Sequence, residues 1–342
     1  MKPSVLQIGF GGFGPTHLKA WTALGYGERL YVADPSPAAR DACRRHGLPE
    51  DRIGADYETF FEAVDLVDVV APTDQHGAIC DKAMDAGKDL FIEKPMTATL
   101  AEAEHLAGRV LAEGRVAQVG FYFRCHPLAQ AARSRVRDGG IGELRYLSGR
   151  FLGFKRARTD SGAVHNDAVH FIDLFNWLTD AFPVRVYAVT RDHFGRGRED
   201  FALLQLTYPG DVIASIEVGY IQPGRWNDVF VPGARATKEI AVCGSAGALE
   251  ADFVTDTFVV HDVRHAFKDG TWRPVFGDRV EPHFGAIDPV DVVTAELRQF
   301  VDSVDRRAPP EAGVVNCGVR VAQTLDAIFA SAEQGVPVEV EH

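Results

Sequence analysis

The chain has 342 residues, of which 46% are hydrophobic and 25% charged, and its formal net charge is −12 at pH 7. This length is too great for one ordinary hydrophobic core and predicts two domains, and the composition excludes a disordered chain. The acidic balance argues against nucleic acid or an anionic membrane as the main partner, because both attract basic surfaces.

The start of the chain, MKPSVLQIGFGGFG, has no charged-then-apolar leader and no cleavage site. No apolar run approaches the ~20 residues that a membrane span needs. The 5 cysteines lie far apart and lack the spacing of metal ligands, which favours buried, reduced thiols. We therefore expect a cytoplasmic protein with no metal site and no membrane partner.

Short apolar runs alternate with amphipathic stretches from residue 4 to about residue 120. Strands are predicted in VLQIG, RLYVAD, VDVVAP, DLFIEKP and VAQVGF. The stretches between several of them read as helices that end at glycine, which adopts the left-handed backbone geometry of a helix terminus. Such a pattern is typical of a parallel sheet covered on both faces. We expect an α/β domain with a doubly wound parallel sheet over residues 1–122.

The pattern changes after residue 122, and strand-like alternation dominates from about residue 185. A helix, a strand (ELRYLSGRF), a polar loop and a second helix (NDAVHFIDLFNWLTD) come first. Short turns such as YPGD then separate the strands, which favours antiparallel pairing. We expect an α+β domain with a large, mostly antiparallel sheet over residues 123–342. The helices near 290–306 and 318–334 could close this domain or pack back on the first.

A glycine-rich turn follows the first strand and opens a helix, with the spacing Gly9-x-Gly11-x-x-Gly14. In a dinucleotide-binding turn the first glycine permits a tight turn, the second lets the backbone approach a pyrophosphate, and the third allows close helix–strand packing. The helix N-terminus then offers N–H groups to phosphate oxygens. The expected loop comprises Gly9, Phe10, Gly11, Gly12, Phe13 and Gly14.

An acidic residue, Asp34, ends the second strand 20 residues after Gly14. An acid at this distance is placed to bind a ribose 2′-hydroxyl and would repel a 2′-phosphate. We therefore expect NAD as the cofactor rather than NADP. NADP stays possible, because Arg40 could reach the same pocket.

Two further strands end in residues that suit a binding site. In an open parallel sheet, ligands bind outside the carboxyl ends of the strands. VDVVAPTDQH and LFIEKP therefore put five more residues on the cofactor side, namely Pro72, Thr73, His76, Glu93 and Lys94.

Together with the glycine turn, the stretches APTDQH, AGKDLFIEKP, GFYFRCHP and GAVHNDAVHFIDLFNWL resemble the glucose–fructose oxidoreductase, inositol dehydrogenase and rhizopine-catabolism (Gfo/Idh/MocA) family. The resemblance covers nearly the whole chain. It implies a Rossmann domain followed by an open-faced antiparallel sheet that such proteins often use to associate, hence a homodimer or homotetramer. It also implies NAD(P)-linked hydride transfer at a carbon of a sugar, cyclitol or sugar nucleotide.

The family's catalytic lysine and histidine map to Lys94 and His170. A histidine suits proton abstraction because its unperturbed pKa is about 6.5, and a lysine can stabilise a developing alkoxide. Many members carry an aspartate four residues before the histidine, where this chain has Asn166, whereas Asp167 lies three residues before it. Both positions can face His170 on a helix, so both are candidate catalytic residues.

Three cations are candidate substrate contacts beside Asn166 and His170. Arg124 follows the last strand of the first domain, and a structural ion pair is an equally good account of it. Lys155 and Arg158 lie in the loop before the histidine helix, where a solvated charge run is the alternative. Asp173, three residues after His170, could orient the imidazole or serve local packing.

Three functions are compatible with these residues. The leading one is a sugar or polyol dehydrogenase or ketoreductase. A second is an enzyme that retains NAD and uses it transiently, for example in glycoside cleavage. A third is a non-catalytic regulator that binds NAD, since a fold alone never establishes function. The joint presence of Lys94 and His170 favours an enzyme, because a pure sensor has no chemical need for both.

Overall fold

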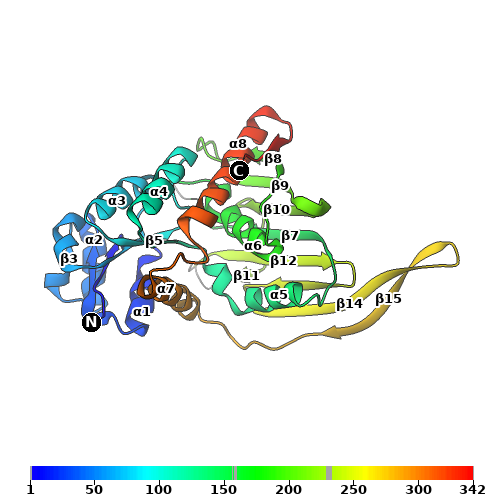
Figure 1. Cartoon of the computed structure of the whole chain (residues 1–342), viewed down its shortest axis with the longest axis horizontal. Helices are drawn as coiled ribbons and strands as arrows, with labels where there is room; N and C mark the ends of the chain where they lie inside the picture. The colour runs from blue at the N-terminus through cyan, green and yellow to red at the C-terminus, as the bar shows by residue number, and fades with distance from the viewer. Residues whose placement is uncertain (1, 156, 158–159, 229–232, 342) are drawn as a thin grey trace. The chain divides into compact units, whose positions relative to one another are not determined.

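The computed structural model describes residues 2–155, 157, 160–228 and 233–341 (Figure 1). The chain divides into two compact units. The first comprises Met1–Tyr122 and Asp288–Ala322, and the second comprises Phe123–Ile287 and Gln323–His342. None of the helices in the described ranges is long and apolar enough to cross a membrane.

The first unit is built on a six-stranded parallel sheet in the order β3-β2-β1-β4-β5-β6. This strand order, which reverses at β1, is that of a Rossmann fold. The strands β1, β4, β5 and β6 are buried along their whole length, as expected of a parallel sheet with helices on both faces. The strands are β1 (Val5–Ile8), β2 (Leu30–Ala33), β3 (Ile53–Gly54), β4 (Leu66–Val69), β5 (Asp89–Glu93) and β6 (Ala117–Gly120).

The helices of this unit begin and end at residues with identifiable roles. Thr99 and Glu102 form a reciprocal capping box at the start of α4, and Gly114 ends that helix with φ +62°. The helices are α1 (Gly14–Ala23), α2 (Pro37–Arg45), α3 (Thr73–Asp85), α4 (Leu100–Glu113) and α7 (Pro289–Arg306). Short turns lie at Gly27–Arg29, Glu50–Arg52, Tyr57–Ala63 and Val314–Gly318.

Helix α7 belongs to the first unit although it follows the second in sequence. Its Val293, Leu297 and Phe300 are buried in one cluster with residues of the glycine turn and the parallel sheet. The sequence allowed the helix near 290–306 either to close the second domain or to pack on the first. The structure shows that it packs on the first. The second domain is expected to span 123–342, but residues 288–322 belong to the first unit. The reason is that α7 buries its apolar face in the Rossmann core.

The second unit is built on a ten-stranded sheet in which, among the described strands, β7 and β10 pair in parallel and the other neighbours pair antiparallel. The expectation of a large, mostly antiparallel sheet is confirmed. Its strands are β7 (Leu144–Leu152), β8 (Arg185–Arg191), β9 (Phe201–Thr207), β10 (Ile213–Gly219), β11 (Trp226–Asn227), β12 (Arg235–Gly244), β13 (Gly247–Asp252), β14 (Thr257–Lys268), β15 (Thr271–Val280) and β16 (Val338–Glu339).

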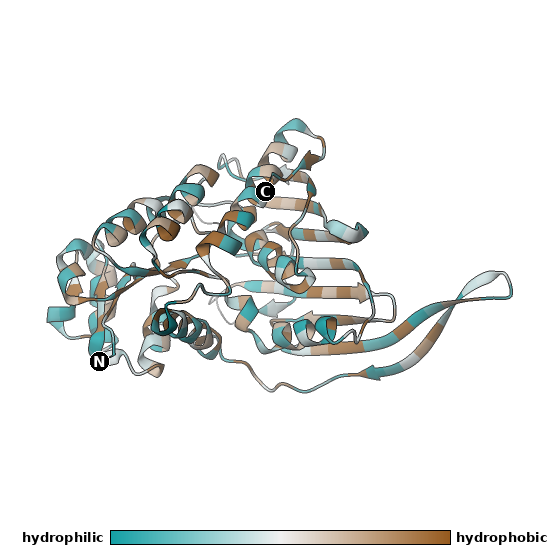
Figure 2. Cartoon of the chain, in the orientation of Figure 1, coloured by the Kyte–Doolittle hydropathy of each residue, from teal (hydrophilic) through white to brown (hydrophobic). Residues whose placement is uncertain are grey.

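One face of this sheet is covered by α6 (Val169–Thr179), in which ten of the eleven residues are buried. A Cβ added at Gly149 of β7 would lie 2.8 Å from the Phe171 ring, so the glycine lets the helix approach the sheet. The opposite face is open, and polar residues alternate with apolar ones along the strands (Figure 2).

The remaining elements of the second unit are short helices and one long hairpin. The helical segments are Tyr122–Cys125, α5 (Pro127–Arg137), a π-turn at Val164–Ala168 and Pro209–Asp211, and α8 (Val319–Gln334) spans the boundary between the units. The hairpin of β14 and β15 extends past the other strands (Figure 1) and exposes Phe267, Trp272 and Phe276.

Candidate active site

The glycine turn between β1 and α1 has the geometry expected of a dinucleotide loop. Gly9 has φ +101°, and a Cβ there would lie 2.7 Å from the Val70 carbonyl carbon. A Cβ at Gly11 or Gly12 would meet nothing within 4 Å, so this part of the turn faces open space. Gly14 opens α1, where a Cβ would lie 3.2 Å from the Gln7 amide nitrogen. The turn is therefore tight at both ends and open in the middle, which fits a pyrophosphate.

Asp34 is tied to this turn at the end of β2. Its carboxylate accepts hydrogen bonds from the backbone N–H groups of Phe10 (2.7 Å) and Ser36 (2.8 Å). Arg40 donates instead to the backbone oxygens of Asp34 and Pro35, at 2.8 and 2.9 Å. The acid is thus held beside the glycine turn, as a ribose-binding carboxylate requires.

The side chains of two other loop residues pack within the protein. Phe10 is 4% exposed and belongs to the core of the first unit. Phe13 is partly buried against that core and meets the ring of His17 edge-on at 5.2 Å. The loop can therefore offer its backbone at these positions, while its aromatic rings anchor it.

The ends of β4 and β5 are joined by His76. Pro72 caps α3 and Thr73 begins it, which places His76 in the first turn, 1% exposed. Its Nε2 lies 2.8 Å from the Ala71 oxygen and its Nδ1 lies 3.1 Å from the Pro95 oxygen. Burial lowers the pKa of His76 below its usual value. Both ring nitrogens face the backbone, so a cofactor contact by this side chain stays a prediction.

Glu93, the last residue of β5, is buried in a charged cluster with His17 and Asp68. His17 Nδ1 lies 2.9 Å from Asp68 Oδ2, and His17 Nε2 lies 3.1 Å from Glu93 Oε1. Burial lowers the pKa of His17, but the two carboxylates outweigh it and raise the pKa to about 10. His17 is therefore a buried imidazolium at neutral pH, and sequence reasoning did not single it out.

Glu93 connects this cluster to Lys94. The second oxygen of Glu93 accepts a hydrogen bond from the Lys94 backbone N–H at 3.1 Å. The two charges of the EKP triplet thus have different surroundings, because Glu93 turns into the core while Lys94 continues past the strand end.

In the second unit, His170 lies on α6 and is 4% exposed. Its ring meets that of Phe123 edge-on at 5.2 Å and lies 6.1 Å from that of Phe151. The π-turn at Val164–Ala168 immediately precedes α6, and such turns often occur at functional sites. A histidine held between aromatic rings at the start of a buried helix is suitably placed for acid–base chemistry.

The π-turn also determines the surroundings of Asn166 and Asp167. Asp167 Oδ1 accepts hydrogen bonds from Lys155 Nζ at 2.7 Å and from Asn166 Nδ2 at 2.9 Å. The Asp167 side chain is 1% exposed and that of Lys155 is 5% exposed. The carboxylate that the sequence places near His170 is therefore engaged by Lys155 and Asn166.

Arg124 and Asp173 form a buried bidentate ion pair. Arg124 Nε lies 2.7 Å from Asp173 Oδ2, and Arg124 Nη2 lies 2.5 Å from Asp173 Oδ1. The structural ion pair that the sequence allowed for Arg124 is therefore present, whereas a substrate contact by Arg124 and the two roles considered for Asp173 stay predictions. Arg158, the third predicted cation, lies outside the described residues.

A second buried lysine, Lys238, is absent from the sequence-based predictions. It donates a hydrogen bond to Asp228 at 2.9 Å, and the two side chains are 2% and 0% exposed. The signal was present in the sequence, because strand alternation in KEIAV places Lys238 on the same face as Ile240 and Val242.

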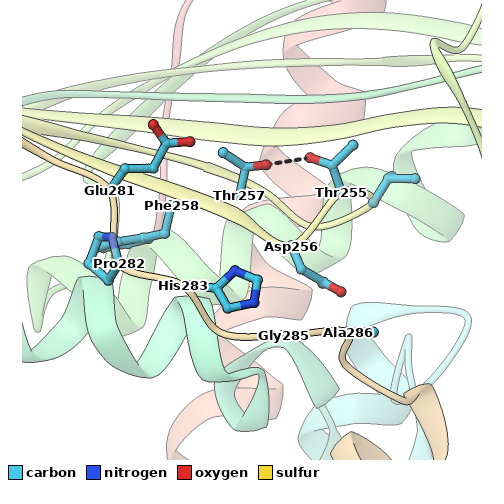
Figure 3. A pocket seen from close by; sticks show the side chains of 10 residues that line it. Thr255, Asp256, Thr257, Phe258, Glu281, Pro282, His283, Gly285 and Ala286 are labelled. Atoms are coloured by element: carbon cyan, nitrogen blue, oxygen red, sulfur yellow. Dashed lines mark hydrogen bonds between the residues drawn. The ribbon is translucent and has the colours of Figure 1, made fainter.

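A cavity of about 600 Å³ lies elsewhere in the second unit, near the base of the hairpin (Figure 3). Its lining includes Asp256 and His283, which Figure 3 shows on facing segments. None of its lining residues is a predicted site residue, so we do not assign the chemistry to it. Within the described residues, no group of three or more His, Cys, Asp or Glu side chains could hold a metal ion.

Both units match known protein families. The model described as "Oxidoreductase family, NAD-binding Rossmann fold" matches residues 4–121, and "GFO/IDH/MocA C-terminal domain" matches residues 129–250. The NAD-binding description falls on the unit that contains the glycine turn and Asp34, which confirms NAD as the predicted cofactor.

Named relatives and solved structures agree with this match. The chain is 27% identical over 309 residues to UDP-N-acetylglucosamine 3-dehydrogenase of Acidithiobacillus ferrooxidans, covering 88% of each chain. It is 32% identical over 181 residues to scyllo-inositol 2-dehydrogenase (NAD(+)) of Bacillus subtilis, covering 51% of this chain and 53% of that one. A levoglucosan dehydrogenase in complex with NADH and L-sorbose has the same fold, with a TM-score of 0.83 at 21% identity over 99% of both chains.

The matches to both units and the NAD-binding geometry of the first lead to one conclusion: the chain belongs to the Gfo/Idh/MocA family of NAD-binding oxidoreductases.

Proposed function

We propose that the protein is a dehydrogenase or ketoreductase that transfers hydride between NAD and a secondary alcohol or ketone carbon of a sugar, cyclitol or sugar nucleotide. The buried His170 ring on α6, in a chain whose other unit binds NAD, carries this proposal. The names of the relatives support the substrate class, since they include a sugar-nucleotide dehydrogenase and a cyclitol dehydrogenase.

His170 acts as the general base when an alcohol is oxidised. Removing hydride from the carbon requires that the hydroxyl proton leave to a base, and an unperturbed imidazole has a pKa of about 6.5. NAD, when bound, supplies the hydride acceptor. The rings of Phe123 and Phe151 pack against the imidazole and limit its access to bulk water.

Lys94 donates hydrogen bonds to the reacting oxygen and stabilises the negative charge that develops on it. Its backbone is held by Glu93, which is itself fixed by the buried His17 imidazolium. Hydride transfer depends steeply on orientation, so a strand end held in this way suits the reaction.

Asn166 and Asp167 have separate roles in this scheme. Asn166 donates to Asp167, and the Asp167 carboxylate pairs with Lys155. We propose that this pair holds Lys155 at the substrate end of the site, while Asn166 occupies the position at which many family members carry an aspartate.

The two other functions remain as alternatives. An enzyme that retains NAD would need no exchange of cofactor, and a regulator would bind NAD without turnover. We also propose a homodimer or homotetramer that associates through the open face of the C-terminal sheet.

The test is turnover by purified protein with NAD⁺ or NADP⁺ and a panel of free sugars, cyclitols and sugar nucleotides, followed by the absorbance of the reduced cofactor. The variants are Lys94→Ala and His170→Ala. Loss of a general acid–base residue typically lowers the rate about 10²- to 10⁴-fold, and we expect a loss of this order in each variant. Lys82→Ala and His105→Ala, on exposed surfaces of the first unit, serve as matched controls.

The outcomes separate the three functions. Turnover lost in both site variants but kept in both controls supports the dehydrogenase. Silence across the panel, with NAD binding intact, favours a retained-cofactor enzyme or a regulator. Turnover that survives both Lys94→Ala and His170→Ala would show that these residues do not carry the chemistry.

A further inference from the structure

Two buried ammonium groups, those of Lys155 and Lys238, flank the histidine helix in the second unit. Their side chains are 5% and 2% exposed, and they lie on segments more than 80 positions apart in sequence. Burial lowers the pKa of Lys238 below its usual value, with Asp228 opposing this effect and the charge of Lys155 adding to it. Neither lysine is therefore a solvated surface residue.

Both ammonium groups lie over the same aromatic ring. Lys155 Nζ is 4.1 Å from the centroid of Phe151, and Lys238 Nζ is 4.8 Å from it. Lys238 of β12 is paired directly with Phe151 of β7 in the sheet, on the face that α6 covers. The Phe151 ring lies 6.1 Å from the ring of His170. The two cations therefore share one aromatic ring with the base that the proposed function requires.

Each lysine has its own aspartate. Lys155 bonds to Asp167 and Lys238 bonds to Asp228, so these four side chains have no net charge. An ammonium has three N–H donors. Among the described residues, the Lys155 ammonium donates one hydrogen bond to an acceptor atom, and that acceptor is Asp167 Oδ1. The second oxygen of Asp167, Oδ2, is buried and has no hydrogen-bond partner.

The remaining N–H donors of Lys155 and the acceptor Oδ2 of Asp167 fit a hydroxyl group better than an ion. A hydroxyl both donates and accepts, so it can bond to an ammonium and to a carboxylate oxygen together. An added carboxylate or phosphate would bring a net charge to a buried, balanced set, which is unfavourable. The faces of Phe151 and Tyr220, which lie 4.1 and 5.4 Å from Lys155 Nζ, supply apolar surface beside these polar groups.

We propose that Lys155 and Lys238, with Asp167 and Asp228, bind hydroxyl groups of an uncharged polyhydroxylated ring beside His170 and disfavour a ring that carries a carboxylate or phosphate there. The proposal rests on the proposed function, because the ring is its substrate, and it narrows that substrate to an uncharged sugar or cyclitol ring. Lys238 is then a specificity-determining residue.

The experiment compares binding and turnover of matched rings by the whole protein. D-glucose and myo-inositol are the uncharged probes, and D-glucuronate and D-glucose 6-phosphate are the charged ones. Kd is measured by calorimetry on protein saturated with NADH, and KM and kcat are measured with NAD⁺. We expect the wild type to bind at least one uncharged ring at least ~10-fold more tightly than either charged one, since an unsatisfied buried group weakens binding by about this much.

The variants remove each ion pair as a unit. Lys238→Met/Asp228→Asn and Lys155→Met/Asp167→Asn leave no buried charge unpaired, and such replacements are often tolerated. We expect each to raise the Kd and KM for the uncharged ring at least ~10-fold, with the KM for NAD⁺ unchanged. Arg150→Met/Glu239→Gln is the matched control, because this ion pair joins the same two strands on their opposite face.

Each result bears on the proposal in one direction. Paired variants that keep the wild-type fold and the wild-type Kd would show that the ion pairs are structural only. A wild type that prefers glucuronate or glucose 6-phosphate, or that binds neither uncharged ring, would overturn the proposed substrate class. Uncharged-ring binding that depends on Lys238 without any turnover would support this inference and refute the dehydrogenase. Turnover that is indifferent to both paired variants would refute the inference alone.

Discussion

At the residue scale, the most informative side chain is one that no motif highlighted. His17 follows the glycine turn on α1 and is completely buried, yet it holds carboxylates from two neighbouring strands. Asp68 is additionally bonded to the Trp21 indole at 2.7 Å. The imidazolium therefore connects the helix of the cofactor turn with the ends of β4 and β5, where Glu93 meets Lys94.

The raised pKa of His17 predicts a specific dependence of stability on pH. The folded protein keeps this proton up to about pH 10, whereas the unfolded chain loses it near pH 6.5. His17 therefore contributes its full stabilisation below pH 6.5 and loses it as pH rises towards 10. We expect His17→Gln to lower the free energy of unfolding at pH 6 by ~3–5 kcal/mol, because it breaks a buried ion pair.

Denaturant unfolding at a series of pH values tests this expectation. The difference between wild type and His17→Gln should shrink between pH 7 and pH 10. His105→Gln, at an exposed histidine that pairs with Asp81, should show no such change. A difference that stayed constant over this range would mean that His17 is neutral in the folded protein.

Cofactor choice is also determined at the residue scale. The Asp34 carboxylate is fixed by the Phe10 and Ser36 N–H groups, where it would repel a 2′-phosphate. We expect Asp34→Ser to raise the NADP/NAD ratio of kcat/KM on the order of 10-fold or more, since a charge–charge repulsion at close range is removed. Asp51→Ser, at an exposed acid, is the control, and an unchanged ratio in Asp34→Ser would exclude Asp34 as the selector.

At the element scale, the π-turn before α6 explains why the sequence could not decide whether Asn166 or Asp167 faces His170. A regular helix would allow both Asn166 and Asp167 to face His170. The π-turn changes the angular spacing of side chains at this point, and Asp167 is held by Lys155 instead. Local sequence does not encode this outcome, because it depends on a lysine from the preceding loop.

The segment Tyr122–Cys125 and α6 are joined by the ion pair of Arg124 and Asp173. We expect Arg124→Met to destabilise the protein by ~3–5 kcal/mol, because it removes the cation from a buried ion pair. Arg124→Met/Asp173→Asn should recover most of that loss and keep the wild-type KM for substrate. Thermal unfolding and steady-state kinetics measure the two effects. A KM that rises in the double variant while its stability is restored would return Arg124 to the substrate contacts.

At the scale of the whole molecule, the open face of the C-terminal sheet is the surface to test for self-association. Tyr146, Tyr187, Leu203 and Ile213 are each 37–46% exposed on this face. We expect Leu203→Arg/Ile213→Arg to convert an oligomer into a species near the chain mass of 37.4 kDa, because buried charges without partners are unfavourable. Light scattering after size exclusion gives the mass.

Leu111→Arg, at an apolar residue of α4 that is 68% exposed, is the control and should keep the mass of the wild type. A wild-type mass near that of one chain would contradict the proposed oligomer. A doubly substituted protein that keeps the wild-type mass would place the interface elsewhere.

Much of the fold could be predicted from local patterns. Most strands of the Rossmann unit, the glycine stops and several strands of the large sheet follow from periodicity and turn residues. Strands β13 and β15 were missed; in β15 all residues are exposed, so burial leaves no pattern there. The position of α7 also had to come from the structure, since an amphipathic helix does not specify which core it joins.

The sequence by itself determined the NAD-binding turn with Asp34 and the helix that carries His170, because each depends on residues that are close together in the chain. Tertiary structure decided which buried charges meet. His17 with Glu93, Arg124 with Asp173 and Lys238 with Asp228 are pairs whose members come from different segments. Such pairs exist because a charge removed from water needs a partner wherever the fold provides one, and sequence spacing carries no record of that choice.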